Sequence, residues 1–219
     1  MKEYMEILKN SELFAGGTED EIEAMFSSLA GIIKEYKKNE FVLRTGDQIS
    51  TLCMVLSGSV YIIKEDFWGN RNIISDVGQG EIFAEAYACL IEEPLGVGVI
   101  ANEPAIILFL DVKHILTDAS MSNKYQIQFI RNMISILAEK NLLVTRKLSH
   151  ITERTTREKL LSYLSAQAIR QRTSSFNIPF NRQELADYLS VDRSAMSNEL
   201  CKMRDEGMLT FRKNQFTLI

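Results

Sequence analysis

The sequence has 219 residues, of which 46% are hydrophobic and 25% are charged, and its formal net charge is −4. This length suits two small domains, and the composition is that of a globular protein with a hydrophobic core. No apolar run reaches the ~18 residues of a membrane span and the N-terminus has no apolar signal segment, so we expect a cytoplasmic protein with no membrane partner. The three cysteines, Cys53, Cys89 and Cys201, lie far apart, which argues against a disulfide framework.

The charge is divided unevenly along the chain. Residues 154–219 hold 11 basic and 7 acidic side chains, whereas residues 1–153 hold 14 basic and 22 acidic ones. The C-terminal part is therefore basic and the remainder acidic. This asymmetry suggests that the C-terminal part meets a polyanion such as nucleic acid.

Residues 1–118 have the pattern of a β-rich domain. After a short helical stretch that ends near Leu29, short β-type runs alternate with glycines. The expected strands are Phe41–Leu43, Leu52–Leu56, Val60–Ile63, Ile73–Ile74, Val97–Ile100 and Ile106–Leu110, and Phe67 and Trp68 are expected at a hairpin tip. Many short strands with no long helices between them predict a sandwich or roll. Cys53 and Cys89 flank these strands and are expected to be small core residues, with a redox role left open.

Residues 119–152 are predicted to form one long dimerisation helix, since neither glycine nor proline occurs between residues 122 and 154. Its apolar positions alternate spacings of three and four, as in the a/d seam of a coiled coil. The seam consists of Ile127, Ile130, Ile134, Leu137, Asn141, Val144, Leu148 and Ile151. Asn141 occupies an a position, where two copies can hydrogen-bond across a parallel dimer. The alternative is a helix packed on its own domain's core, but a narrow seam with a polar residue favours a parallel homodimer.

Residues 153–219 are predicted to form a helical domain that ends in a hairpin. A helix is expected over Thr155–Arg172, followed by two short helices, Arg182–Leu189 and Arg193–Glu206. Ser190 or Asp192 is expected to cap the second of these, and Gly207 stands where a helix-ending glycine belongs. Two strands, Met208–Phe211 and Gln215–Ile219, follow. Two short helices joined by a tight turn and followed by a β-hairpin predict a winged helix-turn-helix.

The run from Arg182 to Leu200, Arg-Gln-Glu-Leu-Ala-Asp-Tyr-Leu-Ser-Val-Asp-Arg-Ser-Ala-Met-Ser-Asn-Glu-Leu, resembles the helix-turn-helix signature of the CRP/FNR superfamily of transcription regulators. Residues 56–60 are similar to that family's strand-turn-strand, and residues 80–86 to its pocket motif. The resemblance implies an α+β protein with an N-terminal double-stranded β-roll, similar to the cyclic-nucleotide-binding jelly roll, a dimerisation helix and a winged helix-turn-helix. It also implies a homodimeric regulator that binds palindromic double-stranded DNA, contacts RNA polymerase and responds to a small-molecule effector.

The same resemblance assigns roles to side chains of the DNA-binding domain. Arg193, near the start of the second helix, is expected to read guanine in the major groove, with Ser194, Ser197 and Asn198 on the same end or face. Phosphate contacts are expected from Arg182, Gln183, Lys202, Arg212 and Lys213. Many relatives have arginine where Asn198 stands, so their half-site sequence cannot be transferred to this chain.

The expected effector pocket departs from the pattern of cyclic-nucleotide-binding relatives. Its residues are Ile82, Phe83, Ala84, Glu85, Ala86 and Val97, with Arg131 of the long helix as a further candidate. Ala84 replaces the motif glycine, and residues 92–99, where an arginine should pair with the cyclic phosphate, have no cation. From Asn72 to Val112 there is no Lys, Arg or His, but seven acids. Because a buried phosphate without a charge partner is strongly disfavoured, we expect that cyclic AMP is not the effector.

Other cofactors and functions are also not expected. Three scattered cysteines do not form an iron–sulfur ligand set, and His114 and His150 are expected at a surface or interface rather than on haem. A cupin-like metalloenzyme needs two or three histidines in the roll, which has none apart from His114 at its edge, so no metal site is expected. A remaining alternative is a cyclic-nucleotide-binding regulatory module without DNA specificity. The intact helix-turn-helix signature counts against it.

Overall fold

The computed structural model describes residues 1–65, 71–90, 93–113, 115 and 124–219. They form two compact units, residues 1–138 and 139–219, and the boundary between these units falls inside one long helix. The expected division into three parts, at residues 118 and 152, stays a prediction. Its first boundary lies outside the described residues, as do Phe67, Trp68 and His114.

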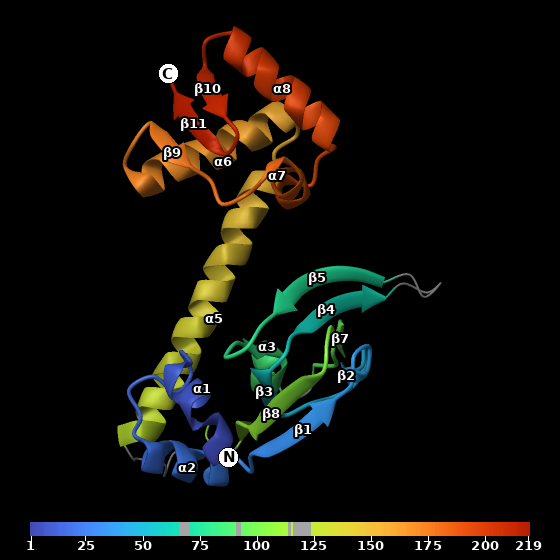
Figure 1. The fold of residues 1–219 in the computed structure, drawn as a ribbon, viewed down its shortest axis with the longest axis vertical. Helices are drawn as coiled ribbons and strands as arrows, with labels where there is room; N and C mark the ends of the chain where they lie inside the picture. The colour runs from blue at the N-terminus through green and yellow to red at the C-terminus, as the bar shows by residue number, and fades with distance from the viewer. Residues whose placement is uncertain (66–70, 91–92, 114, 116–123) are drawn as a thin grey trace. The chain divides into compact units, whose positions relative to one another are not determined.

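The N-terminal unit contains two four-stranded antiparallel sheets (Figure 1). In spatial order, one consists of β1 (Ile32–Tyr36), β8 (Ala105–Asp111), β3 (Thr51–Ser57) and β6 (Ile82–Phe83), and the other of β2 (Phe41–Leu43), β7 (Gly98–Ala101), β4 (Val60–Glu65) and β5 (Arg71–Val77). Side chains from both sheets share one apolar cluster, which includes Val55 and Ile107 from the first and Val60 and Val99 from the second. The predicted β-roll is therefore confirmed.

Strand β3 explains why part of the sequence reads as a continuous apolar run. Its residues 52–56 are all buried. Cys53 and Val55 face the interior of the roll, whereas Leu52, Met54 and Leu56 face a second cluster on the other side of the sheet. Because successive side chains of a strand point to opposite faces, a strand covered on both sides needs apolar residues at every position.

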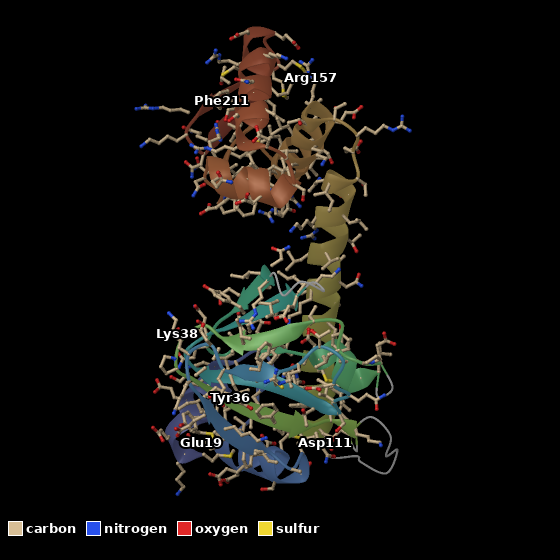
Figure 2. The ribbon with its side chains drawn as sticks, turned by 90° about the vertical axis from the view of Figure 1, so that its right-hand side faces the viewer. Glu19, Tyr36, Lys38, Asp111, Arg157 and Phe211 are labelled. Atoms are coloured by element: carbon tan, nitrogen blue, oxygen red, sulfur yellow. The ribbon has the colours of Figure 1, made fainter. Side chains whose placement is uncertain are left out.

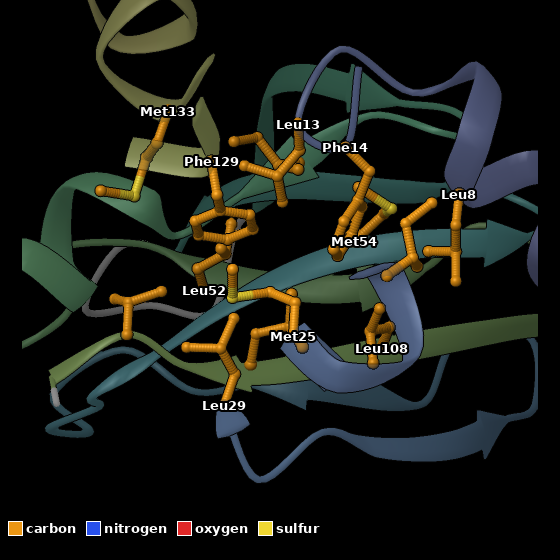
Figure 3. Packing of buried hydrophobic residues seen from close by; sticks show 14 of the residues in the cluster. Leu8, Leu13, Phe14, Met25, Leu29, Leu52, Met54, Leu108, Phe129 and Met133 are labelled. Carbon is orange, nitrogen blue, oxygen red and sulfur yellow. The ribbon is translucent and has the colours of Figure 1, made fainter. Parts of the chain in front are cut away.

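Helices cover the outer face of β3. They are α1 (Met5–Asn10), which follows the 3₁₀ turn Lys2–Tyr4, then α2 (Glu19–Ser28) and the first half of α5 (Lys124–Ile151). Figure 3 shows Phe129 and Met133 of α5 packed among the side chains beneath these helices. The rings of Phe14 and Phe129 lie 5.5 Å apart, centroid to centroid. Thr18 begins α2 with a capping box, in which its side chain and that of Glu21 each accept the other's backbone N–H.

Several short elements were not predicted. Strand β1 mixes exposed and half-buried positions, β6 has two residues, and α3 (Glu85–Cys89) has five. None of these is long enough to show a period of its own. One turn, in contrast, is explained by a single residue. Gly58 has φ +75°, and a Cβ there would lie 2.3 Å from the Pro104 carbonyl oxygen, so only glycine fits between β3 and β4.

The C-terminal unit continues α5 into α6 (Thr156–Gln171), α7 (Arg182–Leu189) and α8 (Arg193–Asp205). A three-stranded sheet follows, in the order β10 (Leu209–Arg212), β11 (Gln215–Leu218), β9 (Ser175–Asn177). One apolar core joins all three helices to this sheet. The predicted winged helix-turn-helix is confirmed, and β9 is an additional strand that pairs with β11. Below, "wing" denotes the β10–β11 hairpin.

Candidate nucleic-acid interface

Local capping interactions fix the two helices of the helix-turn-helix. Asn181 begins α7 with a capping box, in which its side chain accepts the N–H of Glu184 at 3.0 Å and the Glu184 carboxylate accepts the N–H of Asn181 at 2.7 Å. Ser190 ends α7 in the left-handed region, at φ 52°. Asp192 then begins α8 by accepting the N–H of Ala195 at 2.8 Å. Of the two residues expected to cap α8, Asp192 does so, because Ser190 belongs to the end of the preceding helix.

The orientation of α8 follows from its buried face. Met196, Leu200 and Met203 are fully buried against the core, as are Leu185 and Leu189 of α7. The N–H of Gly207, at φ +77°, bonds to the carbonyl of Arg204 just beyond the end of α8. The opposite face of α8 is consequently directed to solvent.

That solvent face carries the four residues expected to read DNA bases. Arg193, Ser194 and Asn198 are exposed, and Ser197 is half-buried. The Ser197 hydroxyl donates to the carbonyl of Arg193 at 2.9 Å, which leaves both lone pairs of its oxygen available as acceptors. The structure thus brings these residues together on the first two turns of α8, and their reading of DNA stays a prediction.

The residues expected to hold phosphates are in three different situations. Arg212 and Lys213 are exposed at the tip of the wing, with Lys213 at φ 53° in its tight turn. Gln183 donates to Asp187 at 2.9 Å, and Lys202 lies 3.7 Å from Glu199, so both are exposed but engaged on their own helix. Arg182 is half-buried with its guanidinium over two phenyl rings of the wing.

Two basic residues of α6 support the interface and were not singled out from the sequence. Lys159 donates to the carbonyls of Leu189 and Ser190, at 3.2 and 3.4 Å, at the end of α7. Arg157, labelled in Figure 2, pairs with Glu199 of α8 at 3.4 Å and also with Glu206. These contacts join residues that are 30 or more positions apart in the chain, so no local sequence pattern predicts them.

The predicted seam of α5 lies beside the face that packs into the N-terminal core. The core face consists of Tyr125, Phe129, Met133 and Ile136. Among the seam residues, Ile127, Ile134, Val144 and Leu148 are 43 to 67% exposed, Asn141 is exposed, and Ile130, Leu137 and Ile151 are half-buried. Every residue from 141 to 149 is exposed in the single chain. Ile130 and Leu137 of the seam also pack against this core, so the part of the seam that is open to solvent in the single chain consists of Ile127, Ile134, Asn141, Val144 and Leu148.

The expected effector residues divide between the two faces of the sheet. Phe83 points into the roll interior and Ile82 into the opposite cluster, Glu85 is buried, Val97 is half-buried and Ala86 is exposed. Ala84 begins α3 in the left-handed region at φ 62°, a conformation that glycine adopts at lower cost. Arg131 is exposed and makes no hydrogen bond or ion pair with the others within the described part of the chain.

The loop before β7 places one of its own side chains in the interior of the roll. Leu95 is buried in the roll core, and its N–H and carbonyl bond to the backbone of Asp47 and Gly46, at 2.9 and 2.8 Å. The hydroxyl of Tyr87 accepts the N–H of Gly96 at 3.2 Å. In residues 93–99, the described part of the stretch in which a phosphate-binding arginine would be expected, an apolar side chain therefore points inward.

Two family models match the sequence in the order of the two units. A cyclic nucleotide-binding domain matches residues 33–117, and a Crp-like helix-turn-helix domain matches residues 158–219. The chain belongs to the CRP/FNR family. The Crp-like helix-turn-helix domain is a DNA-binding domain of transcription regulators, and neither model describes an enzyme of the cupin type, so the cupin-like metalloenzyme is not supported. No curated protein sequence matches the chain.

Solved structures of CRP/FNR-type proteins show the same fold. The c-di-GMP-responsive global regulator CLP of Xanthomonas campestris is 23% identical, with a TM-score of 0.51 over 92% of this chain and 99% of its own. DNR from Pseudomonas aeruginosa is 17% identical, with a TM-score of 0.51 over 100% and 95%. CprK in complex with OCPA is 16% identical, with a TM-score of 0.55 over 90% and 89%. At these identities the similarity concerns the fold alone.

The cysteines and helices of this CRP/FNR chain can be compared with what the sequence predicted. Cys53 is fully buried, as expected of a core residue, and burial raises the pKa of its thiol; Cys89 is half-buried and Cys201 exposed. None of the helices among the described residues combines the length and the hydropathy that a membrane span requires. The expectation that no metal, iron–sulfur cluster or haem is bound stays a prediction.

His150 is a buried residue at the end of α5. Its Nδ1 lies 2.8 Å from the Ser162 hydroxyl of α6, and its ring packs edge-on against Tyr163 at 5.6 Å and beside Tyr188 at 6.3 Å. Lys147 lies over the Tyr188 ring at 5.7 Å, and burial lowers the pKa of His150. His150 was expected at a surface or interface, but within this unit it is buried at the junction between α5 and α6.

We expect acid to destabilise the C-terminal unit through His150. Because its pKa is lowered in the folded state, the unfolded chain takes up the proton first, near the ordinary value of about 6.5. Stability is then full above that pH and falls as the pH drops below it, by at most about 1.4 kcal/mol per pH unit for one proton. Urea titrations of the wild type and of His150→Gln at pH 7.5 and 5.5 measure this loss. An equal loss in both proteins would assign it to other groups.

Proposed function

We propose that this chain is a homodimeric, sequence-specific transcription regulator of the cytoplasm, in which two copies of α8 enter successive major grooves of palindromic DNA and the bound dimer contacts RNA polymerase. The observation that carries the proposal is the solvent face of α8. It presents an arginine, two serines and an asparagine on a helix whose other face is fixed in a core. Arginine and asparagine match the hydrogen-bonding edges of guanine and adenine.

The half of the proposal that concerns DNA is tested at Arg193. We expect Arg193→Ala to weaken binding to a selected palindromic site by about 1–3 kcal/mol more than binding to random duplex, because a base contact is lost rather than a phosphate contact. Arg170→Ala is the matched control, since Arg170 is also exposed but lies on α6, donates to Gln167 at 3.0 Å and is not among the residues expected to contact DNA. Fluorescence anisotropy on both duplexes measures the difference. Equal losses on specific and random DNA would show that Arg193 does not read sequence.

The dimer is supported by the exposed stripe of α5. Val144 and Leu148 are 67% and 52% exposed, spaced as d and a positions, and Asn141 precedes them at another a position. A continuous apolar stripe of this kind is stabilised when it is buried against a second helix. In a parallel pair, the two Asn141 side chains meet and can hydrogen-bond, which favours one register.

The effector, if it binds in the roll, is proposed to be a small molecule other than cyclic AMP. Leu95 fills the interior from the loop before β7, and the described residues between Asn72 and Val112 include no Lys, Arg or His. A cyclic phosphate held by these residues would lack a cationic partner among them and would lose several kcal/mol on desolvation. No metal, iron–sulfur or haem cofactor is proposed either, because the sequence offers three scattered cysteines and two histidines rather than a clustered ligand set.

We expect isothermal calorimetry to show no binding of cyclic AMP at micromolar concentrations of the nucleotide. Arg131, which is exposed on α5, is the one candidate raised from the sequence that would supply a charge from the side. Micromolar binding that disappears in Arg131→Gln would overturn the proposal and identify that residue as the partner. Micromolar binding that persists in the variant would overturn it as well and would indicate capture by backbone amides.

A further inference from the structure

Arg182 is held in a way that differs from every other basic residue of the expected DNA surface. It is the first residue of α7, yet its guanidinium carbon lies 5.0 Å from the ring centroid of Phe211 on β10 and 5.0 Å from that of Phe216 on β11. Within the part of the chain that the structure describes, no carboxylate forms an ion pair with it. Arg182 therefore joins the start of the helix-turn-helix to both strands of the wing.

The two rings form a rigid support for this guanidinium. Phe216 is fully buried and stacks on Phe176 of β9, with centroids 6.5 Å apart and planes at 19°. Phe211 is half-buried, 5.9 Å from Phe216, and Arg204 of α8 lies over it at 5.9 Å. A planar, weakly hydrated guanidinium over aromatic faces is a favourable arrangement that lysine cannot reproduce. Burial also lowers the pKa of Arg182, as expected for a side chain partly removed from water.

The tip of the wing carries the residues whose position depends on this contact. Arg212 and Lys213 are exposed between β10 and β11, and the hairpin that carries them has only four residues in each strand. A short hairpin at the edge of a domain is of low local stability unless something fixes it. Leu209 and Phe216 are buried in the core and β11 pairs with β9, which fixes the base of the hairpin, whereas Arg182 contacts the Phe211–Phe216 pair that lies next to the tip.

We propose that Arg182 is a positioning residue that aligns the wing with α7 through Phe211 and Phe216, and that it is not itself a phosphate ligand. This inference rests on the proposed function, because the wing matters for DNA only if the chain binds DNA. It revises the role that the family resemblance implies for this position. Arg212 and Lys213 keep the role of phosphate ligands, and Arg182 acts through them.

Hydrogen exchange of the free protein tests the structural half of the inference. We expect Arg182→Gln, Arg182→Lys and Phe211→Leu each to speed the exchange of β10 and β11 amides about five-fold, because all three remove the stacking of Arg182 on Phe211. Each variant also loses contacts of its own, Arg182 with Phe216 and Phe211 with Arg204, so the double variant Arg182→Gln/Phe211→Leu should be faster than either single variant but by less than the product of the two single effects. Exchange in α8 should not change. Unchanged exchange in Arg182→Gln, or additive effects in the double variant, would overturn the proposal.

The dependence of DNA affinity on salt tests the functional half. The plot of log K against log salt has a negative slope, and "slope" here denotes its magnitude. A lost phosphate ligand lowers this slope by about one, whereas a lost positioning residue leaves it unchanged. We therefore expect Arg182→Gln to weaken binding at every salt concentration with the wild-type slope, and the control Arg212→Gln to lower the slope. A lowered slope in Arg182→Gln would identify a phosphate ligand and overturn the proposal. If the wild type binds no DNA, the proposed function fails, while the exchange experiment still decides whether Arg182 holds the wing.

Discussion

Replacing Val144 with aspartate is expected to dissociate the protein into monomers at micromolar concentration. Val144 is 67% exposed in the single chain and belongs to none of its apolar clusters, so the substitution costs the isolated fold little. In the proposed dimer the two copies of position 144 face each other across the seam. Burying two like charges there costs several kcal/mol, and about 4 kcal/mol corresponds to a thousand-fold weaker dimer.

Sedimentation equilibrium of the wild type and the variant measures this effect. Leu143→Asp is the matched control, since Leu143 is also apolar and 60% exposed but lies outside the seam. The control should remain dimeric, and both variants should keep the far-ultraviolet circular dichroism of the wild type. A wild type that is monomeric at these concentrations, or equal dissociation of both variants, would contradict the proposed dimer. Loss of specific DNA binding should accompany dissociation, because each half-site then binds alone.

The sequence predicted best the elements whose ends are determined locally. The bounds of α7 are those expected, and α8 ends one residue before the expected end. Their caps, Asn181 and Asp192, act within three residues along the chain, so the sequence contains the whole interaction. The long helix was predictable for a similar reason, because its period repeats over many turns.

Elements that depend on distant partners were not predictable. Strand β9 has three residues and exists because Phe176 pairs with Phe216, 40 positions later in the chain. In the same way, β6 is formed by pairing with β3 through Cys53 and Met54. Such strands are stabilised by long-range pairing and by burial, and neither the pairing nor the burial can be predicted from the few residues of the strand itself.

The candidate site shows the same division. That Arg193, Ser194 and Asn198 share an exposed face follows from helical spacing once α8 is located. The position of Arg182 does not follow from spacing, because its contacts come from two strands about 30 residues further along the chain. The left-handed backbone of Ala84 is also unexpected for alanine from sequence alone, since this residue type gives no signal for that conformation.

The second large effect concerns the other stripe of α5. Phe129 is fully buried and packs against Phe14 beneath the N-terminal helices, although it is not a seam residue. We expect Phe129→Ala to lower the free energy of unfolding of the N-terminal unit by about 3–5 kcal/mol, because both the transfer of the ring and the cavity that it leaves are unfavourable. Urea titrations followed by circular dichroism measure the loss. They should be carried out in the Val144→Asp background, so that dimer dissociation does not contribute.

Ile127→Ala in the same background is the control, because Ile127 lies on the same turn of α5 but is 43% exposed. Its loss should be below about 1 kcal/mol, as for a partly solvated surface position. In the dimer the difference between the two losses in free energy of unfolding should be smaller. Ile127 is then buried in the seam, so its truncation also removes interface area. Equal losses in the monomer would mean that the two stripes are not separate. The helix would then serve only its own core, and the exposed seam would no longer support a partner.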